Sequence, residues 1–299
     1  MQFSKPPLSV PDQLALLKSR GLSIGNEAKA NKYLSNISYY RLSAYTLYFQ
    51  KANSINHEFL PGVTFDDILN LYLFDRELRL LVFDAIERTE VAFRTQLVNQ
   101  FSVAYHGNWF EDVALFSNNS YHSNCLITLD NEIKRSGEEF IKHYKNKYTN
   151  PSRPPSWISL EVASMGLLSR YYRNIKMCPP KKDIATHFGL PSPYILESWM
   201  QSMSYVRNIC AHHGRLWNRT LTSSPTLPRN TSKQWLNDMT FPPNKLYAFL
   251  CCLVYLRKIV NPKSAFAIRI EKLLNKYPDI NTNSMGFHYN WKAEPIWNA

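Results

Sequence analysis

The strongest pattern in the sequence is a stretch of about 40 residues, 65–105, in which apolar side chains recur with the period of an α-helix. Thr64 precedes it at the position of an N-cap, and Asp66 and Asp67 stand in its first turn, where carboxylates stabilise the positive end of the helix dipole. Elsewhere helical periodicity also dominates, strand-like alternation is rare, and Gly occurs only 9 times in 299 residues. This pattern argues against a β-barrel and predicts an all-α protein of about eight to ten helices.

The order of the expected helices predicts one main domain with additions. Residues 1–60 are expected to form an N-terminal helical extension, and residues 61–299 a helical domain. Within this domain, the more polar segment 106–150 is expected to be an insertion with one short helix, and the aromatic tail 280–299 a C-terminal strap. A second long helix is expected over 192–219, where Pro near the start and helical periodicity coincide.

The chain is basic, with 35 Lys and Arg against 23 Asp and Glu and a net charge of +12. Residues 196–299 alone carry 13 Lys and Arg against five Asp and Glu, which gives them a net charge of +8. A basic region favours polyanions such as nucleic acid, although a solvated surface without a ligand accounts for the charge equally well. RNA is therefore a candidate partner only in combination with other features.

The cysteines and the hydropathy of the chain predict a cytoplasmic protein. Five cysteines without a C-x-x-C pair suit a reducing compartment. The N-terminal MQFSKPPLSVPDQ lacks the apolar stretch of a signal peptide, and the longest apolar run, 247–256, is far shorter than the ~18 residues of a membrane span. No zinc-ligand spacing, Walker loop or dinucleotide-binding fingerprint occurs. We therefore expect no membrane span, no metal and no cofactor.

The end of the second long helix carries the stretch RNICAHHGRLWNR, which begins at Arg207. With about 100° of turn per residue, His212 lies near Asn208 on a polar face that also holds Arg215, and Arg207 lies at the flank of this face. His213 falls on the opposite, apolar face. The helical wheel therefore predicts an accessible His212 and a buried or supporting His213.

These side chains suit acid–base chemistry on a phosphate ester. An imidazole can take or give a proton near neutral pH, and a nearby guanidinium lowers the pKa of the imidazole, which favours the neutral form that a general base needs. The planar guanidinium of Arg207 suits a phosphate, and Asn208 can orient His212 or the ligand. Such a set could cleave RNA by deprotonating the 2′-hydroxyl, which attacks the adjacent phosphorus. The bare Arg–His spacing is common by chance and gains weight only from the polar face and the basic segment.

A stripe of charged residues on the 65–105 helix is a second candidate feature. Glu87, Glu90 and Arg94 share one face, and Glu90 and Arg94 are spaced as an i,i+4 ion pair. The stripe is either a surface ladder of ion pairs or a support that faces Arg207.

Further basic residues could contact RNA. Arg41 lies in the Tyr-rich YLSNISYYRLSAY, whose rings could stack on bases but are more typical of an amphipathic core. Arg215 and Arg219 could follow an RNA backbone, or each could be a solvated surface residue.

The chain resembles the Abi family, the AbiD/AbiF-like abortive-infection proteins of bacterial phage defence. The matching stretches run in order from about residue 13 to 297 and include YLSNISYYRLSAY, FDRELRLLVFDAIERTEVAFRTQL, PPSWISLEVASMGLLSRYY and RNICAHHGRLWNR. The last stretch also resembles the Arg-polar-x-x-x-His signature of the HEPN superfamily of all-α ribonuclease domains.

The resemblance implies an HEPN-like helical core and a toxin that cleaves RNA without a metal during phage infection. Arg207 would bind and stabilise the phosphate, Asn208 would orient, and His212 would be the acid or base, although the motif spacing leaves His213 open. A homodimer is implied, and a second copy would supply the second proton-transfer group that one imidazole cannot. The implied partners are RNA as substrate and a small RNA as inhibitor. The alternatives are a non-catalytic RNA-binding protein and a protein-interaction module of a defence system.

Overall fold

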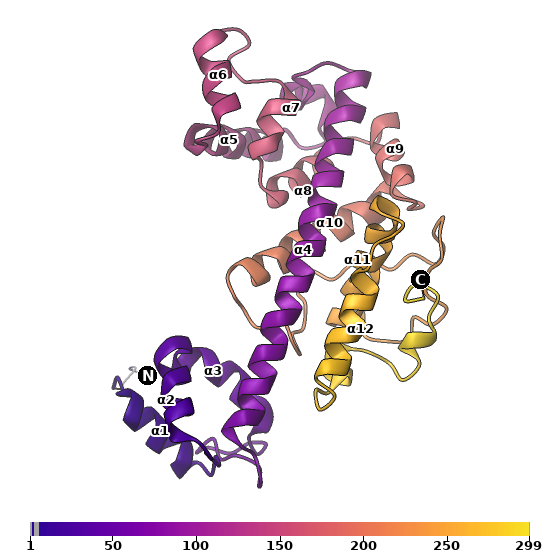
Figure 1. Ribbon diagram of the computed structural model, residues 1–299. Coiled ribbons are helices and arrows are strands. Elements are labelled where there is room, and N and C mark those ends of the chain that lie inside the picture. Colours follow the sequence, from indigo (N-terminus) through magenta and orange to yellow (C-terminus); the bar gives the residue numbers. More distant parts are fainter. Residues whose placement is uncertain (1, 3–5, 299) are drawn as a thin grey trace. The chain divides into compact units, whose positions relative to one another are not determined.

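A computed structural model describes residue 2 and residues 6–298, and within these residues the fold is all-α, as the sequence predicts (Figure 1). The α-helices are α1 (Val10–Ser19), α2 (Glu27–Ile37), α3 (Tyr39–Thr46), α4 (Phe65–Ala104), α5 (Asn119–Arg135), α6 (Glu139–Lys147), α7 (Ser156–Ser159), α8 (Met165–Asn174), α9 (Pro179–His187), α10 (Pro193–Ala211), α11 (Leu246–Val260) and α12 (Phe266–Lys276). Short 3₁₀ helices are η1 (Leu47–Phe49), η2 (Trp109–Glu111), η3 (Val113–Leu115), η4 (Leu160–Val162), η5 (Thr282–Met285) and η6 (Trp291–Ala293). In place of strands, the described residues form only isolated β-bridges.

The chain divides into two compact units. Unit 1 comprises Met1–Arg79 and Leu273–Ile280, and unit 2 comprises Leu80–Lys272 and Asn281–Ala299. Both α4 and α12 therefore contribute residues to each unit. The division into an extension, 1–60, and a main domain with an insertion and a strap stays a prediction.

The start of α4 follows the local chemistry of its sequence. The Thr64 hydroxyl accepts the Asp67 N–H at 3.2 Å, and the Asp67 carboxylate accepts the Thr64 N–H at 2.8 Å. This reciprocal pair satisfies amide groups that the first turn of a helix leaves without partners. The predicted helix and its N-cap are thus confirmed.

Unit 1 contains a buried polar cluster at the centre of its helices. The Tyr45 hydroxyl of α3 donates to the Asp75 carboxylate at 2.6 Å, and Arg79 donates both to Tyr45 at 3.1 Å and to Asp75. In a separate and more exposed contact, Lys276 at the end of α12 and the next residue, Tyr277, donate to Glu77 at 2.7 Å and 2.8 Å. Since buried polar groups are costly unless they are paired, the bonds among Tyr45, Asp75 and Arg79 fix how α3 and α4 meet within unit 1.

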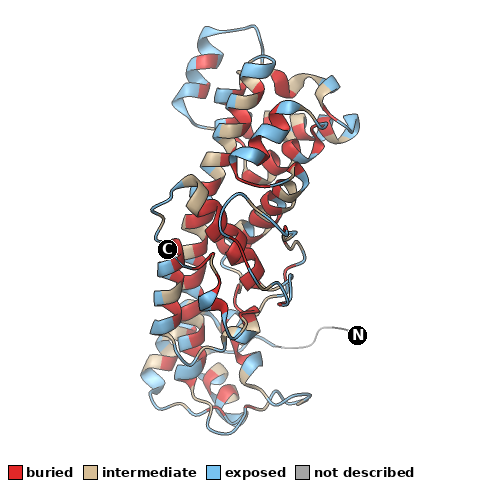
Figure 2. Ribbon diagram, turned by 90° about the vertical axis from the view of Figure 1, so that its right-hand side faces the viewer, coloured by how far each residue is buried: buried red, intermediate tan, exposed pale blue. Residues whose placement is uncertain are grey.

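The core of unit 2 is built around α11. Its residues Leu246–Arg257 are all buried, and buried residues are red in Figure 2. α8 packs against both α10 and α5, and α10 also packs against α9. The C-terminal tail adds aromatic side chains to this core, since Trp297 stacks on Tyr247 of α11 with ring centroids 6.0 Å apart. Trp199 of α10 contacts Tyr255 of α11, and α8 packs on α10, so both helices that carry the candidate site are part of the core of unit 2.

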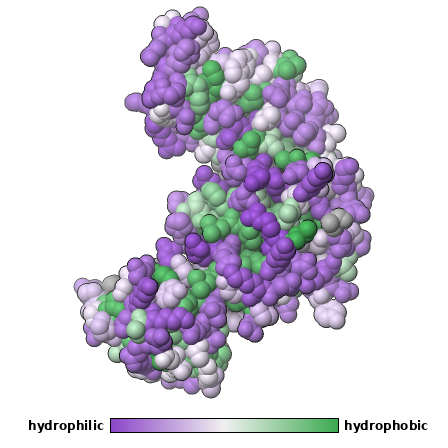
Figure 3. Space-filling model, viewed as in Figure 1, coloured by the Kyte–Doolittle hydropathy of each residue, from purple (hydrophilic) through white to green (hydrophobic). Residues whose placement is uncertain are grey.

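The polar segment 106–150 is more regular than its sequence indicates. It forms two helices, α5 and α6, where one short helix was expected over about 131–148. The chain leaves the helical conformation at Ser136, in a Ser-Gly pair with low helix propensity. The surface over α6 is mainly hydrophilic in Figure 3.

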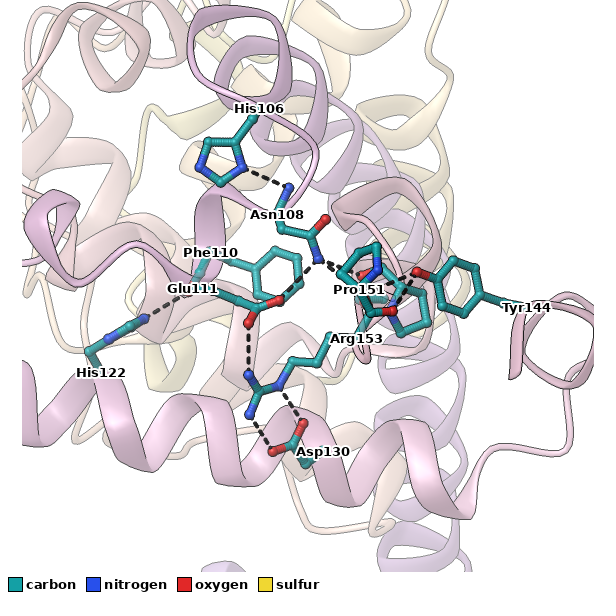
Figure 4. Close-up of polar contacts among 11 residues, drawn as sticks. His106, Asn108, Phe110, Glu111, His122, Asp130, Tyr144, Pro151 and Arg153 are labelled. Carbon is teal, nitrogen blue, oxygen red and sulfur yellow. Dashed lines mark hydrogen bonds and ion pairs between the residues drawn. The ribbon is translucent and has the colours of Figure 1, made fainter. Parts of the chain in front are cut away.

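An ion-pair network ties this segment together (Figure 4). Arg153 binds Asp130 of α5 through two nitrogens, at 2.7 Å and 2.9 Å, and Glu111 through the third, at 2.9 Å. Asn108 donates to Glu111 at 3.0 Å, and Tyr144 of α6 donates to the carbonyl of Pro151 at 2.8 Å. A bidentate Arg–carboxylate pair is among the stronger side-chain interactions, so the network anchors α5, which forms one wall of the cleft described below.

Within the described part of the chain, no helix combines the length and the apolar character that crossing a bilayer requires.

Candidate functional site

The motif helix α10 ends earlier than the sequence predicts. It begins with Ser192 as N-cap and Pro193, and it ends at Ala211 rather than at residue 219. The His213 N–H donates to the Cys210 carbonyl at 3.1 Å and the Gly214 N–H to the Ile209 carbonyl at 2.8 Å. Together with the left-handed φ of 57° at His213, these bonds form a Schellman C-cap.

The early helix end overturns the predicted position of His213. A helical wheel extended through residue 213 placed its side chain on the buried face, whereas His213 is exposed in the left-handed turn. Beyond this turn the chain carries Leu216 and Trp217, both fully buried, into the core. His212 keeps near-helical backbone angles as the C-cap residue, one turn after Asn208, and it is also exposed. Burial therefore does not separate the two histidines.

Arg207 lies half-buried on α10 beside α4. Its guanidinium carbon is 5.7 Å from the centre of the Phe83 ring, a cation–π contact. Among the described residues, no carboxylate oxygen lies within ion-pair distance of Arg207. The guanidinium is thus held by an aromatic face, and its donors remain available for an anionic ligand.

The stripe on α4 faces this part of α10. The Arg94 Nη2 atom pairs with Glu90 at 2.9 Å and donates to the Ala163 carbonyl at 3.0 Å. The side chains of Glu90 and Arg94 are only 14% and 12% exposed. The expected i,i+4 pair is therefore present, as a half-buried contact rather than as a surface ladder.

The electrostatics of Glu90 show which charges are near it. Burial raises the pKa of Glu90, the positive charges of Arg94 and Arg207 oppose this rise, and the negative charge of Glu87 adds to it. Two carboxylates and two guanidinium groups therefore act on one another here. Glu87 is exposed and reaches solvent at the edge of the cluster.

Of the other predicted basic residues, Arg219 contacts the motif helix, whereas Arg41 belongs to the other unit. Arg41 is an exposed residue of α3 and belongs to unit 1. Arg215 and Arg219 lie after the end of α10, where the Arg219 Nε atom donates to the Arg215 carbonyl at 2.8 Å. Hydrogen bonds from Thr222 and Arg219 lower the pKa of Tyr205 against the opposing effect of its burial. Arg219 is thus engaged with α10 itself.

A cleft of about 400 Å³ between α8, α10 and α5 was missed at the sequence level. Its lining includes Arg170 and Arg173 from α8, and Ser204 and Tyr205 from the turn of α10 that precedes Asn208. Two arginines three residues apart in the stretch SRYYR could have signalled it, because that spacing places them on one face of a helix.

Metal ligation finds no support in the geometry of this region. Within residues 6–298 and residue 2, no group of three or more His, Cys, Asp and Glu side chains is placed to hold a metal ion.

Comparison with known proteins gives one match. A family model described as Abi-like protein matches residues 32–218, which is more than half of the chain and includes the stripe on α4, both histidines and the lining of the cleft except Ser223. No curated protein and no solved structure matches the sequence. The family is named for abortive infection, a defence of bacteria against phage, and on the strength of this match the chain belongs to the Abi-like protein family.

Proposed function

We propose that this protein is a metal-independent endoribonuclease toxin that acts in abortive infection. One observation supports this most directly: Arg207, which has no carboxylate oxygen within ion-pair distance among the described residues, lies on the last turns of α10, shortly before the exposed C-cap residue His212. Arginine donors and a titratable imidazole are the groups that acid–base cleavage of a phosphodiester needs.

In the proposed reaction, His212 takes the proton of the ribose 2′-hydroxyl, and the 2′-oxygen attacks the adjacent phosphorus. The 5′-oxygen leaves with a proton, and a 2′,3′-cyclic phosphate remains. Arg207 offsets the negative charge that develops on the phosphate oxygens. Asn208, one turn before His212, orients the imidazole or the phosphate.

The partners of the reaction follow from its geometry. Proton removal and proton donation take place on opposite sides of the phosphorus, so one imidazole cannot easily perform both, and a second proton-transfer group is part of the proposal. A second copy of the chain would supply this group as a second His212 across a two-fold axis. A homodimer bound to RNA is therefore the proposed active form, and a small RNA that occupies the same site would act as an inhibitor.

The stripe on α4 is proposed to position Arg207. Phe83 fixes the guanidinium from one side, and Glu90 attracts it without forming a direct ion pair. An arginine held in this way keeps its donors free, whereas a tight carboxylate pair would compete with the phosphate.

The test is RNA cleavage by the purified protein in EDTA, with analysis of the product ends. We expect cyclic phosphate ends from the wild type and a loss of cleavage of at least 100-fold in His212→Ala and Arg207→Gln, since removing a general base or an electrostatic donor costs about that much. His143→Ala, at an exposed position of α6, is the matched control and keeps full activity. His213→Ala, measured alongside, identifies which histidine transfers the proton.

Two results would contradict the proposal. Cleavage that requires a divalent ion would exclude the metal-independent mechanism. RNA binding by all variants without cleavage by any would instead favour a non-catalytic RNA-binding protein, and the absence of salt-dependent RNA binding would favour a protein-interaction module.

A further inference from the structure

The cleft between α5, α8 and α10 is lined by polar residues without a carboxylate. Its lining residues are Tyr121, Ser164, Gly166, Ser169, Arg170, Arg173, Gln201, Ser204, Tyr205 and Ser223. Two positive charges and four hydroxyl-bearing serines face one open space, and none of the lining side chains is an acid that could neutralise the arginines. The positive charge of such a cleft favours the binding of an anion.

The two arginines differ in how they are held. The Arg173 Nη2 atom donates to the Tyr121 hydroxyl at 2.5 Å, its Nη1 atom is 3.5 Å from the Gln201 amide oxygen, and its guanidinium lies over the Tyr121 ring. Arg170 is half-buried, and within the described chain it has no carboxylate or hydrogen-bonding partner. One guanidinium is therefore fixed in place by neutral groups, and the other is free to turn towards a ligand.

The start of α8 adds to the positive character of the cleft. Ser164 is the N-cap of α8, and Gly166 lies so close to α10 that a Cβ atom there would be 3.2 Å from the Ser204 hydroxyl. The positive end of the α8 dipole thus lies at the wall of the cleft. Glu132 accepts the Ser164 N–H at 3.0 Å and is 3.6 Å from Arg135, and its side chain lines a second hollow rather than this cleft.

A second hollow of unit 2 provides a contrast. It is lined by Glu132, Glu138 and Glu161 with a single arginine, Arg135. The two hollows therefore differ in the charge of their lining.

The position of the cleft relates it to the motif. Ser204 and Tyr205 line the cleft, and Asn208 follows one turn later on the same face of α10, about 5 to 6 Å along the helix axis. We propose that the cleft binds a phosphate group through Arg170 and Arg173, and that this phosphate belongs to the RNA strand next to the one that is cleaved. The second half of this inference rests on the proposed function, whereas the phosphate site itself does not.

Binding is tested by fluorescence anisotropy with a labelled single-stranded RNA, in a His212→Ala background that prevents cleavage. Arg170→Gln combined with Arg173→Gln should weaken binding at least tenfold and should lower the slope of log K against log salt, between about 50 and 200 mM, by about 1.4, because each lost phosphate contact on a single strand removes about 0.7. Arg170→Gln alone should lower the slope by about 0.7, and Arg170→Lys should keep it. Since Arg170 has no internal partner, its variants are expected to melt like the wild type.

Arg135→Gln is the matched control, because it removes the same charge from an exposed position, 74% accessible, on the acidic hollow. It should leave RNA affinity and salt slope unchanged. Wild-type affinity and slope in both Arg170→Gln and the double variant would overturn the phosphate site.

Inorganic phosphate and a mononucleotide distinguish the source of the ligand. If either binds in an Arg170-dependent way while RNA binding is unaffected by the variants, the cleft holds a free phosphate ester and the RNA assignment is wrong. The cleavage assay is independent of these measurements. If RNA binding depends on Arg170 but the protein cleaves no RNA, the phosphate site is supported and the nuclease proposal is wrong. If the protein cleaves RNA but the variants bind RNA like the wild type, the nuclease proposal is supported and the phosphate site is wrong.

Discussion

The buried cluster of unit 1 gives the sharpest prediction for stability. The Asp75 side chain is fully buried and that of Arg79 is 6% exposed, and Asp75 accepts hydrogen bonds from Arg79 and from Tyr45. Asp75→Asn keeps the size of the side chain but removes its charge. It leaves the Arg79 guanidinium buried with only neutral partners, and removing one partner of a buried pair costs about 3 to 5 kcal/mol.

Hydrogen exchange measures this cost locally. A loss of about 3 kcal/mol should accelerate exchange of the slowest amides of α3 by roughly 100-fold, because each 1.36 kcal/mol corresponds to a factor of ten. Amides of α11 in unit 2 serve as the internal reference. Glu58→Gln removes an exposed pair with Lys51, with side chains 46% and 49% accessible, and should change exchange less than fivefold. Exchange in α3 within threefold of the wild type for Asp75→Asn would refute the inference that this cluster holds α3 against α4.

Three further predictions concern single side chains. His213→Gly should be more stable than His213→Ala by about 1 kcal/mol in urea melts, because both lose the imidazole but only Gly adopts φ 57° without strain. Burial would raise the pKa of Glu77, but hydrogen bonds from Lys276 and Tyr277 lower it overall. Glu77 therefore stabilises the fold above its unfolded-state pKa, and this contribution is lost as the pH falls through the lower folded-state pKa. The melting of Glu77→Gln should accordingly depend less on pH than that of the wild type below about pH 5. His212→Ala should leave the melting curve within about 0.5 kcal/mol of the wild type, since the side chain is exposed, so that a loss of cleavage in this variant is not a loss of folding.

The sequence predicts α4 well because its start is encoded locally. Periodicity identifies the helix, and the reciprocal bonds of Thr64 and Asp67 lie within one turn. Charged residues on α4 were harder to assign, because their partners come from elsewhere in the chain. Arg79 of α4, for example, is buried and donates a hydrogen bond to Tyr45, a residue 34 positions earlier in the chain. A spacing rule for one helix cannot identify such a partner.

The end of α10 could not be predicted for a different reason. A left-handed C-cap usually carries Gly or Asn, but here Gly214 follows the turn and His213 itself takes the left-handed angle. Without the usual signal, a helical wheel continues too far and assigns His213 to the core. The cleft was missed because its walls come from three helices, α5, α8 and α10, that are separated in the sequence. Only the packing of α8 against both α5 and α10 brings their side chains together.

The polar face of α10 links the two proposals. Gln201 and Ser204 line the cleft, Asn208 follows on the same face, and His212 ends the helix about 16 Å from Gln201 at 1.5 Å per residue. An RNA strand bound along this face would contact the arginines of the cleft at one end and the imidazole of His212 at the other. Guanidinium groups stay charged at every relevant pH, whereas an imidazole does not. RNA affinity should therefore depend mainly on salt and cleavage mainly on pH, and this separation would not arise if one set of residues performed both tasks.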